Sequence, residues 1–374
     1  MDELADTITA DVAIIGAGIA GAGLAADLAG DFEVVLIEQE SRPGYHSTGR
    51  SAAIFIQNYG NAAIRALTRA SWSLFSRPDA ALFPMPLVSQ RGLLYVAGEE
   101  GLAQHAALMA EGEDLRELSL DEARTMVPLL RPEWLRAAAY EHDAQDIDVA
   151  ALHQGWLKKA KGSGTRIITD AGLAAARHDK GRWHVETRAG VVNAGIVVNA
   201  AGAWADTVAN VSGVSPLGIQ PMRRTMAVLP VPPELDVARW PLISDSAEGW
   251  YAKPEAGRLQ VSPDDEDPVD AHDAFVDDMV LAEGLYRFEQ AMDFPVTRVE
   301  TSWAGLRSFA PDRTPVAGFD RTAEGFFWLA GQGGYGIQTS PALSRLAGQL
   351  IRRASTHDDL AGLASALSPN RFRN

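Results

Sequence analysis

The chain has 374 residues, of which 47% are hydrophobic and 22% charged, with a formal net charge of −16 at pH 7 and no cysteine. This composition predicts a folded protein of two domains, or of one large domain with an elaborated partner, and the negative charge disfavours binding to nucleic acids or anionic lipids. The lack of cysteine excludes disulfides, thiolate metal sites, a thiol nucleophile and a cysteinyl-linked cofactor.

Targeting signals are not evident in the sequence. Residues 1–6 are acidic and lack the basic and then apolar pattern of a secretory signal. No run approaches the ~20 apolar residues that a membrane-spanning helix needs. We therefore expect a cytoplasmic enzyme without an integral membrane segment.

A glycine-rich turn near the N-terminus predicts a dinucleotide site. The apolar run 12–15 leads directly into Gly16, Gly18 and Gly21, spaced as Gly-x-Gly-x-x-Gly, and residues 24–29 are expected to form the following helix. In such a unit the first glycine permits a tight turn and the second lets the backbone approach a pyrophosphate. The third lets the helix pack closely against the strand.

The next strand strengthens this prediction. Residues 32–38 form an apolar run that ends at Glu38, 20 positions after Gly18, where a carboxylate is expected to bind a ribose hydroxyl. The loop 43–53 that follows is rich in glycine and small hydroxyl residues and suits the wrapping of a ligand. Its His46 and Arg50 either contact phosphate or ring edges of that ligand, or stabilise the loop.

The middle of the chain changes character. Helical spacing predicts a helix within 60–77, and Ser119 and Glu122 fit a capping box. Asp148 is expected to cap a helix over 149–161.

Residues 221–300 carry many prolines and alternating strand signals, which suit an antiparallel sheet. The acidic turn 264–267 lies within this region, and its spacing favours a solvated loop over a metal site, so no metal is expected.

The C-terminal part repeats the pattern of the N-terminal part, a buried strand followed by a glycine-rich run and a helix. A buried strand over 326–330 precedes the glycine-rich run 331–341, which opens a helix to about Arg352. Such a loop at a helix N-terminus favours negative charge. The first turn already serves the pyrophosphate, so this one suits a cofactor that becomes anionic on reduction. That reasoning favours FAD over NAD.

Several segments together resemble the D-amino-acid oxidase/glycine oxidase family of FAD enzymes. They are Gly16–Gly21, Val198–Trp204, Trp303–Arg307 and Gly333–Gln338. Within that family, three further segments look like FAD-dependent D-arginine dehydrogenases. They are 43–53, 146–155 and 267–273.

The resemblance implies an α/β protein with a Rossmann-type FAD-binding domain and a substrate domain built on a mixed, largely antiparallel β-sheet. The FAD-binding domain would comprise 1–84, 145–220 and 301–374, and the substrate domain 85–144 and 221–300. It also implies oxidation of an α-amino acid to an imino acid by hydride transfer to non-covalently bound FAD. The electrons would then pass to a quinone or other carrier, or to O₂.

Site residues carry over at matching positions. The resemblance implies that Arg224 and Arg307 hold the substrate carboxylate, that Tyr59 and Tyr251 wall the substrate pocket, and that Gly305 offers its carbonyl to the substrate amine. Gln338 would lie near the flavin ring. The full set expected to bind FAD is Gly16, Gly18, Ile19, Ala20, Gly21, Glu38, Gln39, His46, Ser47, Thr48, Arg50, Ser51, Ala52, Ala53, Leu173, Ala201, Gly202, Trp204, Gly305, Arg307, Gly333, Gly334, Tyr335, Gly336, Ile337 and Gln338.

The chain departs from the arginine enzymes at pocket positions. Leu93 stands where those enzymes carry the glutamate that pairs with the guanidinium, and Ile54 stands where they carry a histidine. An unpaired cation against leucine costs several kcal/mol in a desolvated pocket. We therefore expect a D-amino-acid dehydrogenase for neutral, apolar or small side chains. Gln260 occupies the position at which some oxidases of the family place a lysine, which favours a dehydrogenase over an oxidase.

Three alternatives remain open at this point. The same carboxylate clamp would serve a secondary amine such as sarcosine or D-proline. An NAD-dependent dehydrogenase is disfavoured by the second glycine-rich loop. A non-catalytic flavoprotein subunit would not need both Arg224 and Arg307. Apart from these alternatives, a histidyl link of FAD through His46 is disfavoured.

Overall fold

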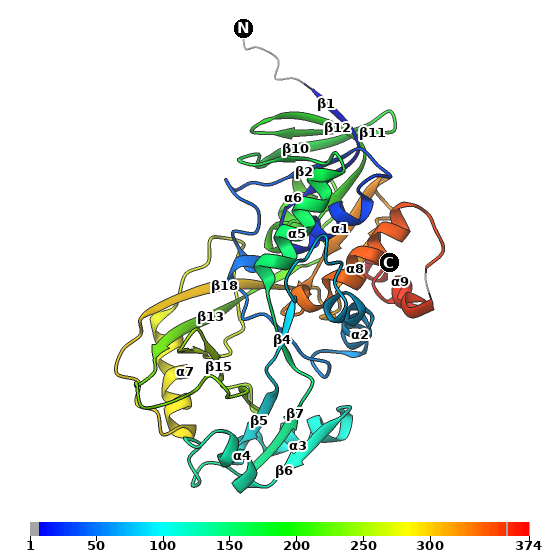
Figure 1. Ribbon diagram of the computed structural model, residues 1–374. Coiled ribbons are helices and arrows are strands. Elements are labelled where there is room, and N and C mark those ends of the chain that lie inside the picture. Colours follow the sequence, from blue (N-terminus) through cyan, green and yellow to red (C-terminus); the bar gives the residue numbers. More distant parts are fainter. Residues whose placement is uncertain (1–6, 357, 374) are drawn as a thin grey trace.

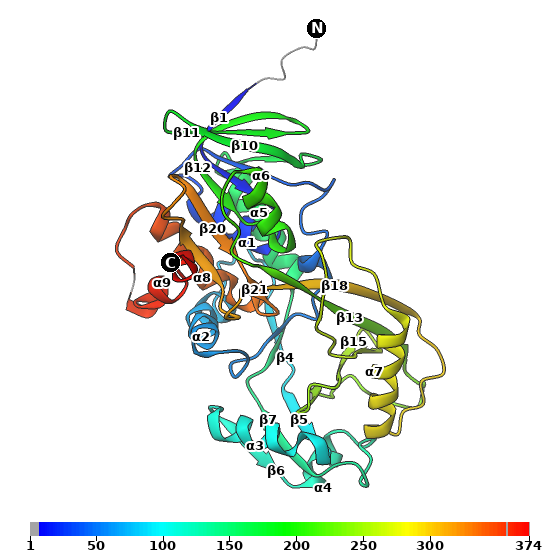
Figure 2. The ribbon, with the colours of Figure 1, turned by 180° about the vertical axis from the view of Figure 1, so that it is seen from behind.

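A computed structural model of the protein describes residues 7–356 and 358–373. The acidic residues 1–6, on which the expected absence of a secretory signal rests, lie outside the described part. The molecule is elongated, with one large sheet toward each end and several segments that pass between them (Figure 1). Figure 2 shows the same two lobes from behind.

The first lobe is built on an eight-stranded sheet of Rossmann type. Its strand order is β10-β11-β12-β1-β2-β9, with β20 paired to β12 and β19 to β20. β1 lies parallel to β2 and to β12, as the βαβ pattern of the sequence predicts. The strands are β1 (Ile8–Ile15), β2 (Val34–Ile37), β9 (Arg166–Ile168), β10 (Leu173–Asp179), β11 (Arg182–Thr187), β12 (Gly190–Asn199), β19 (Val316–Phe319) and β20 (Phe326–Ala330).

Helices cover both faces of this sheet. On one face α1 (Ile19–Leu28), α2 (Ala62–Ser76), α5 (Val149–Gly162), α8 (Gly336–Ile351) and α9 (Leu363–Ala366) share a buried apolar cluster. On the other face α6 (Ala205–Val211) packs beneath the sheet (Figure 1).

The first of these helices, α1, begins at Ile19, five residues earlier than expected. The sequence gives little sign of this, because Gly21 and Gly23 in its first turns lower the helix propensity. Close packing compensates: a Cβ on Gly23 would lie 2.3 Å from Ser344 Oγ on α8 and 2.8 Å from the Trp156 ring on α5. The small residues therefore let three helices approach at the point where the dinucleotide turn begins.

The second lobe is built on a ten-stranded sheet in which only β5 and β14 pair in parallel, so the predicted mixed, largely antiparallel sheet is confirmed. Its helices α4 (Leu120–Met126) and α7 (Asp278–Ala291) pack on the sheet, and α3 (Leu102–Glu111) lies beside β5 and β7. The strands are β5 (Leu93–Ala97), β6 (Leu115–Leu118), β7 (Ala137–Glu141), β13 (Gln220–Pro230), β14 (Leu242–Asp245), β15 (Tyr251–Glu255), β16 (Arg258–Ser262), β17 (Asp267–Pro268), β18 (Thr301–Phe309) and β21 (Gln332–Gly333).

One strand of this sheet belongs to a segment that was expected in the other domain. β18 begins the segment 301–374 that was assigned to the FAD-binding domain, yet it pairs with β13 along its whole length. The long β13–β18 ribbon runs from the second lobe toward the first (Figure 1). By strand pairing, β18 and β21 thus belong to the second sheet.

A small sheet joins the two lobes. It contains β3 (Ile54–Phe55), β8 (Gln145–Ile147) and β4 (Val88–Gln90), in that order. The predicted helix caps are confirmed. Asp148 accepts a hydrogen bond from Ala151 N at the start of α5, and Ser119 and Glu122 form a complete capping box on α4. The loop 43–53 leads into this small sheet.

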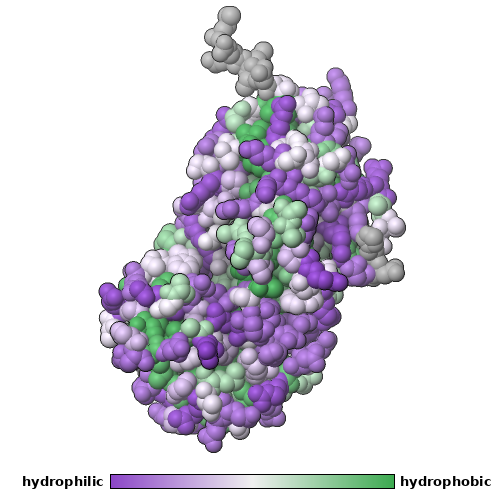
Figure 3. Space-filling model, viewed as in Figure 1, coloured by the Kyte–Doolittle hydropathy of each residue, from purple (hydrophilic) through white to green (hydrophobic). Residues whose placement is uncertain are grey.

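Hydrophobic and hydrophilic side chains alternate in small groups over the face seen in Figure 3. That mixture agrees with the ordinary share of charged residues, 22%, in the sequence. None of the helices in the described part of the chain has the length and apolar character that crossing a membrane requires.

Candidate active site

A cavity of about 670 Å³ lies between the two lobes, lined by the ends of strands from both sheets. One end reaches Glu38 and Leu173 in the first lobe, and the other reaches Leu93 and Tyr251 in the second. All the residues predicted to bind cofactor or substrate line this cavity except Gly21. The structure thus brings the predicted residues together around one cavity, and their binding roles stay predictions.

The glycine-rich turn between β1 and α1 has the expected geometry. Gly16 has a φ of +100°, and a Cβ there would lie 2.5 Å from the carbonyl oxygen of Ala200. A Cβ on Gly21 would lie 1.9 Å from the carbonyl oxygen of Gly16. Gly21 thus supports the turn from behind and does not face the cavity, which is the packing role that the motif predicts.

Glu38 ends β2 beside this turn. Its Oε2 accepts from Ala17 N at 3.0 Å and its Oε1 from Glu40 N at 3.0 Å. Burial raises the pKa of Glu38, an effect that the two amide hydrogen bonds oppose. Glu38 lines the cavity, and its binding of a ribose hydroxyl stays a prediction.

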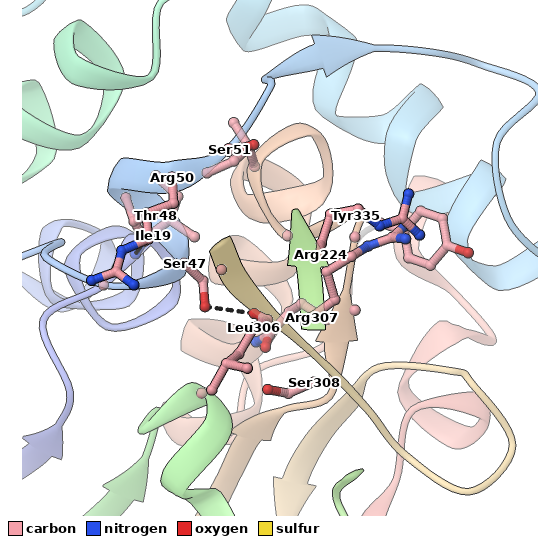
Figure 4. A pocket seen from close by; sticks show the side chains of 18 of the residues that line it. Ile19, Ser47, Thr48, Arg50, Ser51, Arg224, Leu306, Arg307, Ser308 and Tyr335 are labelled. Carbon is pink, nitrogen blue, oxygen red and sulfur yellow. Dashed lines mark hydrogen bonds between the residues drawn. The ribbon is translucent and has the colours of Figure 1, made fainter. Parts of the chain in front are cut away.

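The loop 43–53 covers the cavity and docks on β18. Ser47 Oγ donates to the carbonyl oxygen of Leu306 at 2.6 Å (Figure 4), and Thr48 Oγ1 accepts from Ile19 N at 3.0 Å. Arg50 donates to the carbonyl oxygens of Ala274 and Ala304 and pairs with the carboxylate of Asp273. Of the two roles considered for Arg50, its hydrogen bonds support the structural one.

His46 is held in a similar way. Its Nε2 lies 2.9 Å from Glu40 Oε1, and its ring lies 4.5 Å from that of Trp204, centroid to centroid. Both rings line the cavity wall. His46 therefore forms part of the wall and is itself fixed by a carboxylate.

The two predicted clamp arginines come from neighbouring strands. Arg224 on β13 lies opposite Gly305 on β18, and Arg307 follows Gly305 by two residues. Alternation along a strand places residues two apart on one face, so all three face the cavity. Figure 4 shows both arginines entering the cavity beside Tyr335.

Aromatic rings hold the guanidinium of Arg307. Its Nη2 donates to Tyr59 Oη, and the ring of Tyr59 stacks edge-on against that of Tyr335 with centroids 4.6 Å apart. The guanidinium carbon of Arg224 lies 5.9 Å from the centroid of the Tyr251 ring. Tyr59 and Tyr251 thus flank the clamp, and Tyr59 also positions it.

The electrostatic surroundings of the two arginines differ. Burial lowers the pKa of Arg224, and the positive charge of Arg307 lowers it further. Burial also lowers the pKa of Arg307, but the neighbouring tyrosines and Glu266 outweigh this and leave it above its ordinary value. Arginine stays protonated in both settings. A substrate carboxylate between them would relieve the repulsion between two close positive charges.

The acidic turn 264–267 is not the solvated loop that the sequence suggested. Asp264 pairs with Arg224, and Glu266 lies between Arg307 and the more exposed Arg313. Its other two acids face away from the cavity and bind Arg223 and Thr225. The turn was predicted to be solvated because its density of charge is typical of loops, whereas its partners lie far away in the sequence.

An apolar wall faces the clamp. Ile56, Leu93 and Leu242 form a buried cluster, against which Ile54 and Tyr251 pack. All five line the cavity. The prediction that Ile54 and Leu93 belong to the pocket therefore agrees with the structure.

Two glutamines were singled out near the flavin, and only Gln338 lines the cavity. Gln338 Oε1 accepts from Ile56 N at 3.0 Å, and its Nε2 donates to the Ile56 carbonyl and to Thr68 Oγ1. The side chain thus anchors the segment after β3, and its polar atoms already have partners. Gln260 pairs across β16 with Val228 and Lys253 and is not among the cavity-lining residues.

Residues 11–350 match the sequence model of the FAD dependent oxidoreductase family, DAO. The chain belongs to this family. It is similar to glycine oxidase from Geobacillus kaustophilus (strain HTA426), with 25% identity over 94% of this chain and 95% of that protein. The FAD-dependent oxidoreductase domain-containing protein 1 of Xenopus laevis is 29% identical, and that match covers 43% of this chain and 35% of the relative.

Solved structures agree on the fold of this FAD-dependent oxidoreductase. The structure of L-proline dehydrogenase from P. horikoshii has a TM-score of 0.84 and 22% identity and covers 98% of each chain. The glycine oxidase structure from Geobacillus kaustophilus has a TM-score of 0.82. The predicted family, fold class and FAD cofactor are thereby confirmed. The narrower likeness to D-arginine dehydrogenases stays a prediction.

The cavity suits FAD at both ends. Glu38 suits the ribose, and the turn 16–18 at the N-terminus of α1 suits the pyrophosphate. The second glycine-rich run, 333–336, places the N-terminus of α8 along the same cavity. Side chains at Gly16 or Gly21 would collide with backbone, so the cradle depends on glycine there.

Three supporting residues of the oxidoreductase were missed in the sequence. His153 Nε2 lies 2.8 Å from the carbonyl oxygen of Ala17, and burial lowers the pKa of this histidine. The neutral ring therefore donates to the turn that binds the dinucleotide. Lys253 Nζ donates to the carbonyl oxygen of Ala52 at 3.0 Å and pairs with Asp146 at 3.3 Å.

The third missed residue is Glu141. It lies opposite Leu93 on β7, accepts from Tyr95 Oη at 3.0 Å and from Gln57 N at 2.9 Å, and is buried, which raises its pKa. A lone histidine, lysine or glutamate in a helix or strand carries no signal of such a role. Their partners become neighbours only through the fold.

Gly334 leaves room for the guanidinium of Arg307. A Cβ there would lie 1.8 Å from Arg307 Nη2, so Gly334→Ala should displace the clamp. We expect KM for the substrate to rise about tenfold to a hundredfold while FAD stays bound, since misplacement by ~1 Å can cost 10²-fold. Steady-state kinetics and the flavin absorption spectrum measure both effects. Gly162→Ala, where a Cβ would meet nothing within 4 Å, is the control, and an unchanged KM in Gly334→Ala would contradict the placement of Arg307.

Proposed function

We propose that this FAD-dependent oxidoreductase oxidises a D-amino acid with a neutral, apolar or small side chain to the imino acid, which water then hydrolyses. The observation that carries the proposal is the opposition of two guanidiniums, Arg224 and Arg307, to an apolar wall that includes Leu93. A planar carboxylate is the natural partner of such a pair of guanidiniums. An apolar side chain would pack on the wall.

FAD would accept the hydride, and the protein would supply orientation. The clamp would hold the carboxylate, and the Gly305 carbonyl, opposite Arg224 in the sheet, would accept a hydrogen bond from the amine. With the carboxylate and the amine both held, the Cα–H bond can point in one direction only. Such positioning increases the rate by several orders of magnitude. The closed wall of Tyr59 and Tyr251 would exclude water from the reacting carbon.

We further propose that electrons leave to a quinone or another carrier. Gln260 does not line the cavity and carries no argument here. The proposal is supported by the cavity lining: no lysine, the residue that some oxidases of the family place near the flavin, is among the described residues that line it. Lys253 lies behind the wall, with its ammonium bound to Ala52 and Asp146. Peroxide formation in air as fast as turnover with an artificial acceptor would overturn the proposal.

Anaerobic mixing of the FAD-loaded protein with a panel of D- and L-amino acids tests the proposed function. We expect neutral D-amino acids to bleach the oxidised-flavin band, with little response to D-arginine or to the L-isomers. Bleaching by L-isomers alone would overturn the proposed stereochemistry. No bleaching by any amino acid would overturn the proposed substrate class.

A second candidate is supported by the comparisons. Relatives and structural neighbours are a glycine oxidase and an L-proline dehydrogenase. Oxidation of glycine or of a secondary amine, such as sarcosine or D-proline, would use the same carboxylate clamp. Including these compounds in the panel separates the candidates, because an enzyme of this second kind would respond to them faster than to D-alanine or D-valine.

A substitution at Leu93 should change the substrate preference from apolar D-amino acids toward D-arginine. Leu93→Glu would place a carboxylate in the apolar wall beside Leu242 and raise kcat/KM for D-arginine at least tenfold, since an unpaired buried cation costs several kcal/mol. The same change should lower kcat/KM for apolar substrates. Leu93→Gln, which has the shape of glutamate without its charge, is the control. An unchanged value for D-arginine would contradict the alignment of Leu93 with the glutamate.

A further inference from the structure

The clamp is already partly neutralised by the protein itself. Five charged side chains meet at this wall of the cavity: the guanidiniums of Arg224, Arg307 and Arg313 and the carboxylates of Asp264 and Glu266. Three positive and two negative groups leave a single positive charge. A wall with this balance can neutralise one carboxylate and no more.

The two carboxylates are held differently. Asp264 pairs with Arg224, and both side chains are largely buried, at 14% exposed. Glu266 is 31% exposed and lies between a buried and an exposed partner: its Oε1 is 3.5 Å from Arg307 and its two oxygens are 2.9 Å from Arg313 Nη2. Arg313 is 47% exposed and lies over the Phe309 ring at 3.9 Å. Glu266 can therefore lose its contact with Arg307 and keep a partner.

We propose that Glu266 is a built-in counter-ion that limits the clamp to one substrate carboxylate. When a carboxylate binds Arg307, Glu266 keeps Arg313 as its partner. A second carboxylate that reaches this wall would be repelled by Glu266 and Asp264, because the three arginines there are already neutralised by the two acids and the first carboxylate. The inference rests on the proposed use of Arg224 and Arg307 as a carboxylate clamp, and it selects monocarboxylate amino acids over dicarboxylates such as D-aspartate and D-glutamate.

The neighbouring acids provide a matched comparison. Along the turn the side chains alternate: Asp264 and Glu266 line the cavity, whereas Asp267 lies outside it and accepts from Arg223 Nη2 at 2.7 Å. Asp267→Asn removes the same charge from the same turn without touching the clamp. A general effect of net charge would appear in both variants, and an effect of position only in Glu266→Gln.

The test is a titration of the FAD-loaded protein with benzoate and isophthalate, a monocarboxylate and a matching dicarboxylate, followed by the change in flavin absorption. We expect Glu266→Gln to tighten benzoate binding about tenfold, since a unit charge a few Å away in a half-buried site is worth that much or more. Isophthalate binding should tighten more, so that the preference for the monocarboxylate shrinks. Asp267→Asn should leave both dissociation constants unchanged.

Arg313 supplies a test with the opposite sign. Arg313→Gln leaves Glu266 with only the clamp arginines, Arg307 at 3.5 Å and Arg224 at 3.9 Å, and should weaken benzoate binding about tenfold. The double variant Glu266→Gln/Arg313→Gln restores the single positive charge and should bind benzoate as the unchanged protein does. If benzoate fails to bind the unchanged protein, or if the variants do not follow this order, the inference is overturned. Because the titration involves no turnover, its result is independent of whether the amino-acid panel is oxidised.

Discussion

Replacement of Arg307 by methionine is expected to lower kcat/KM for the substrate roughly 30- to 4,000-fold, mainly through KM. Loss of one partner from a buried, hydrogen-bonded charge pair costs ~2–5 kcal/mol, and each ~1.4 kcal/mol is a factor of ten. Arg307 is 13% exposed and receives its orientation from Tyr59, so no solvated side chain can take its place. Methionine keeps an unbranched apolar stem about as far as Nε and removes the guanidinium with its charge and donors.

Two further variants separate charge from geometry at this position. Arg307→Lys keeps the positive charge but loses the planar fork, and should recover part of the binding. Arg298→Ala removes an arginine that is 67% exposed and pairs with Glu300, and should leave the kinetics unchanged. The flavin spectrum shows whether each variant still holds FAD. If Arg307→Met keeps kcat/KM within threefold while FAD stays bound, Arg307 does not hold the substrate carboxylate.

The parts of this site that could be predicted share one property: their signal is local in the sequence. The spacing of Gly16, Gly18 and Gly21 and the distance to Glu38 are set by one βαβ unit, so they describe the dinucleotide site without the rest of the fold. The helix caps Ser119 and Asp148 are local for the same reason. Resemblance to a family extended this to Arg224 and Arg307, which no spacing in the sequence connects.

The features that could not be predicted from the sequence depend on contacts between distant segments. The acidic turn at Asp264 carries the composition of a solvated loop, and only the β13–β18 ribbon brings Arg224 and Arg307 beside it. Gln338 lines the cavity, but no local pattern shows that its amide binds the backbone of Ile56, 282 positions away. β18 opens the segment 301–374 that the sequence assigned to the FAD-binding domain, and only its pairing with β13 shows that it joins the second sheet.

Gly21→Ala is expected to yield a protein that binds FAD at least a hundredfold more weakly than the unchanged chain. The new Cβ would lie 1.9 Å from the carbonyl oxygen of Gly16 and 3.3 Å from Ile14 Cγ2. Neither the strand nor the turn can yield, because Gly16 itself is held against Ala200 with a φ of +100°. Overpacking of this kind costs ~1–3 kcal/mol or more, so the free energy of unfolding should fall as well.

Titration of the apoprotein with FAD and a thermal unfolding curve measure the two effects of Gly21→Ala. Gly162→Ala is the matched control: it lies at the end of α5, a Cβ there meets nothing within 4 Å, and alanine favours a helix over glycine by about 0.5–1 kcal/mol. That variant should bind FAD normally and unfold no earlier. The contrast isolates the cause, since both changes add one methyl group to a helix of the first lobe. If Gly21→Ala binds FAD as tightly as Gly162→Ala does, then α1 can move away from β1 without loss of the site, and the close contact at Gly21 is not what forms the cradle.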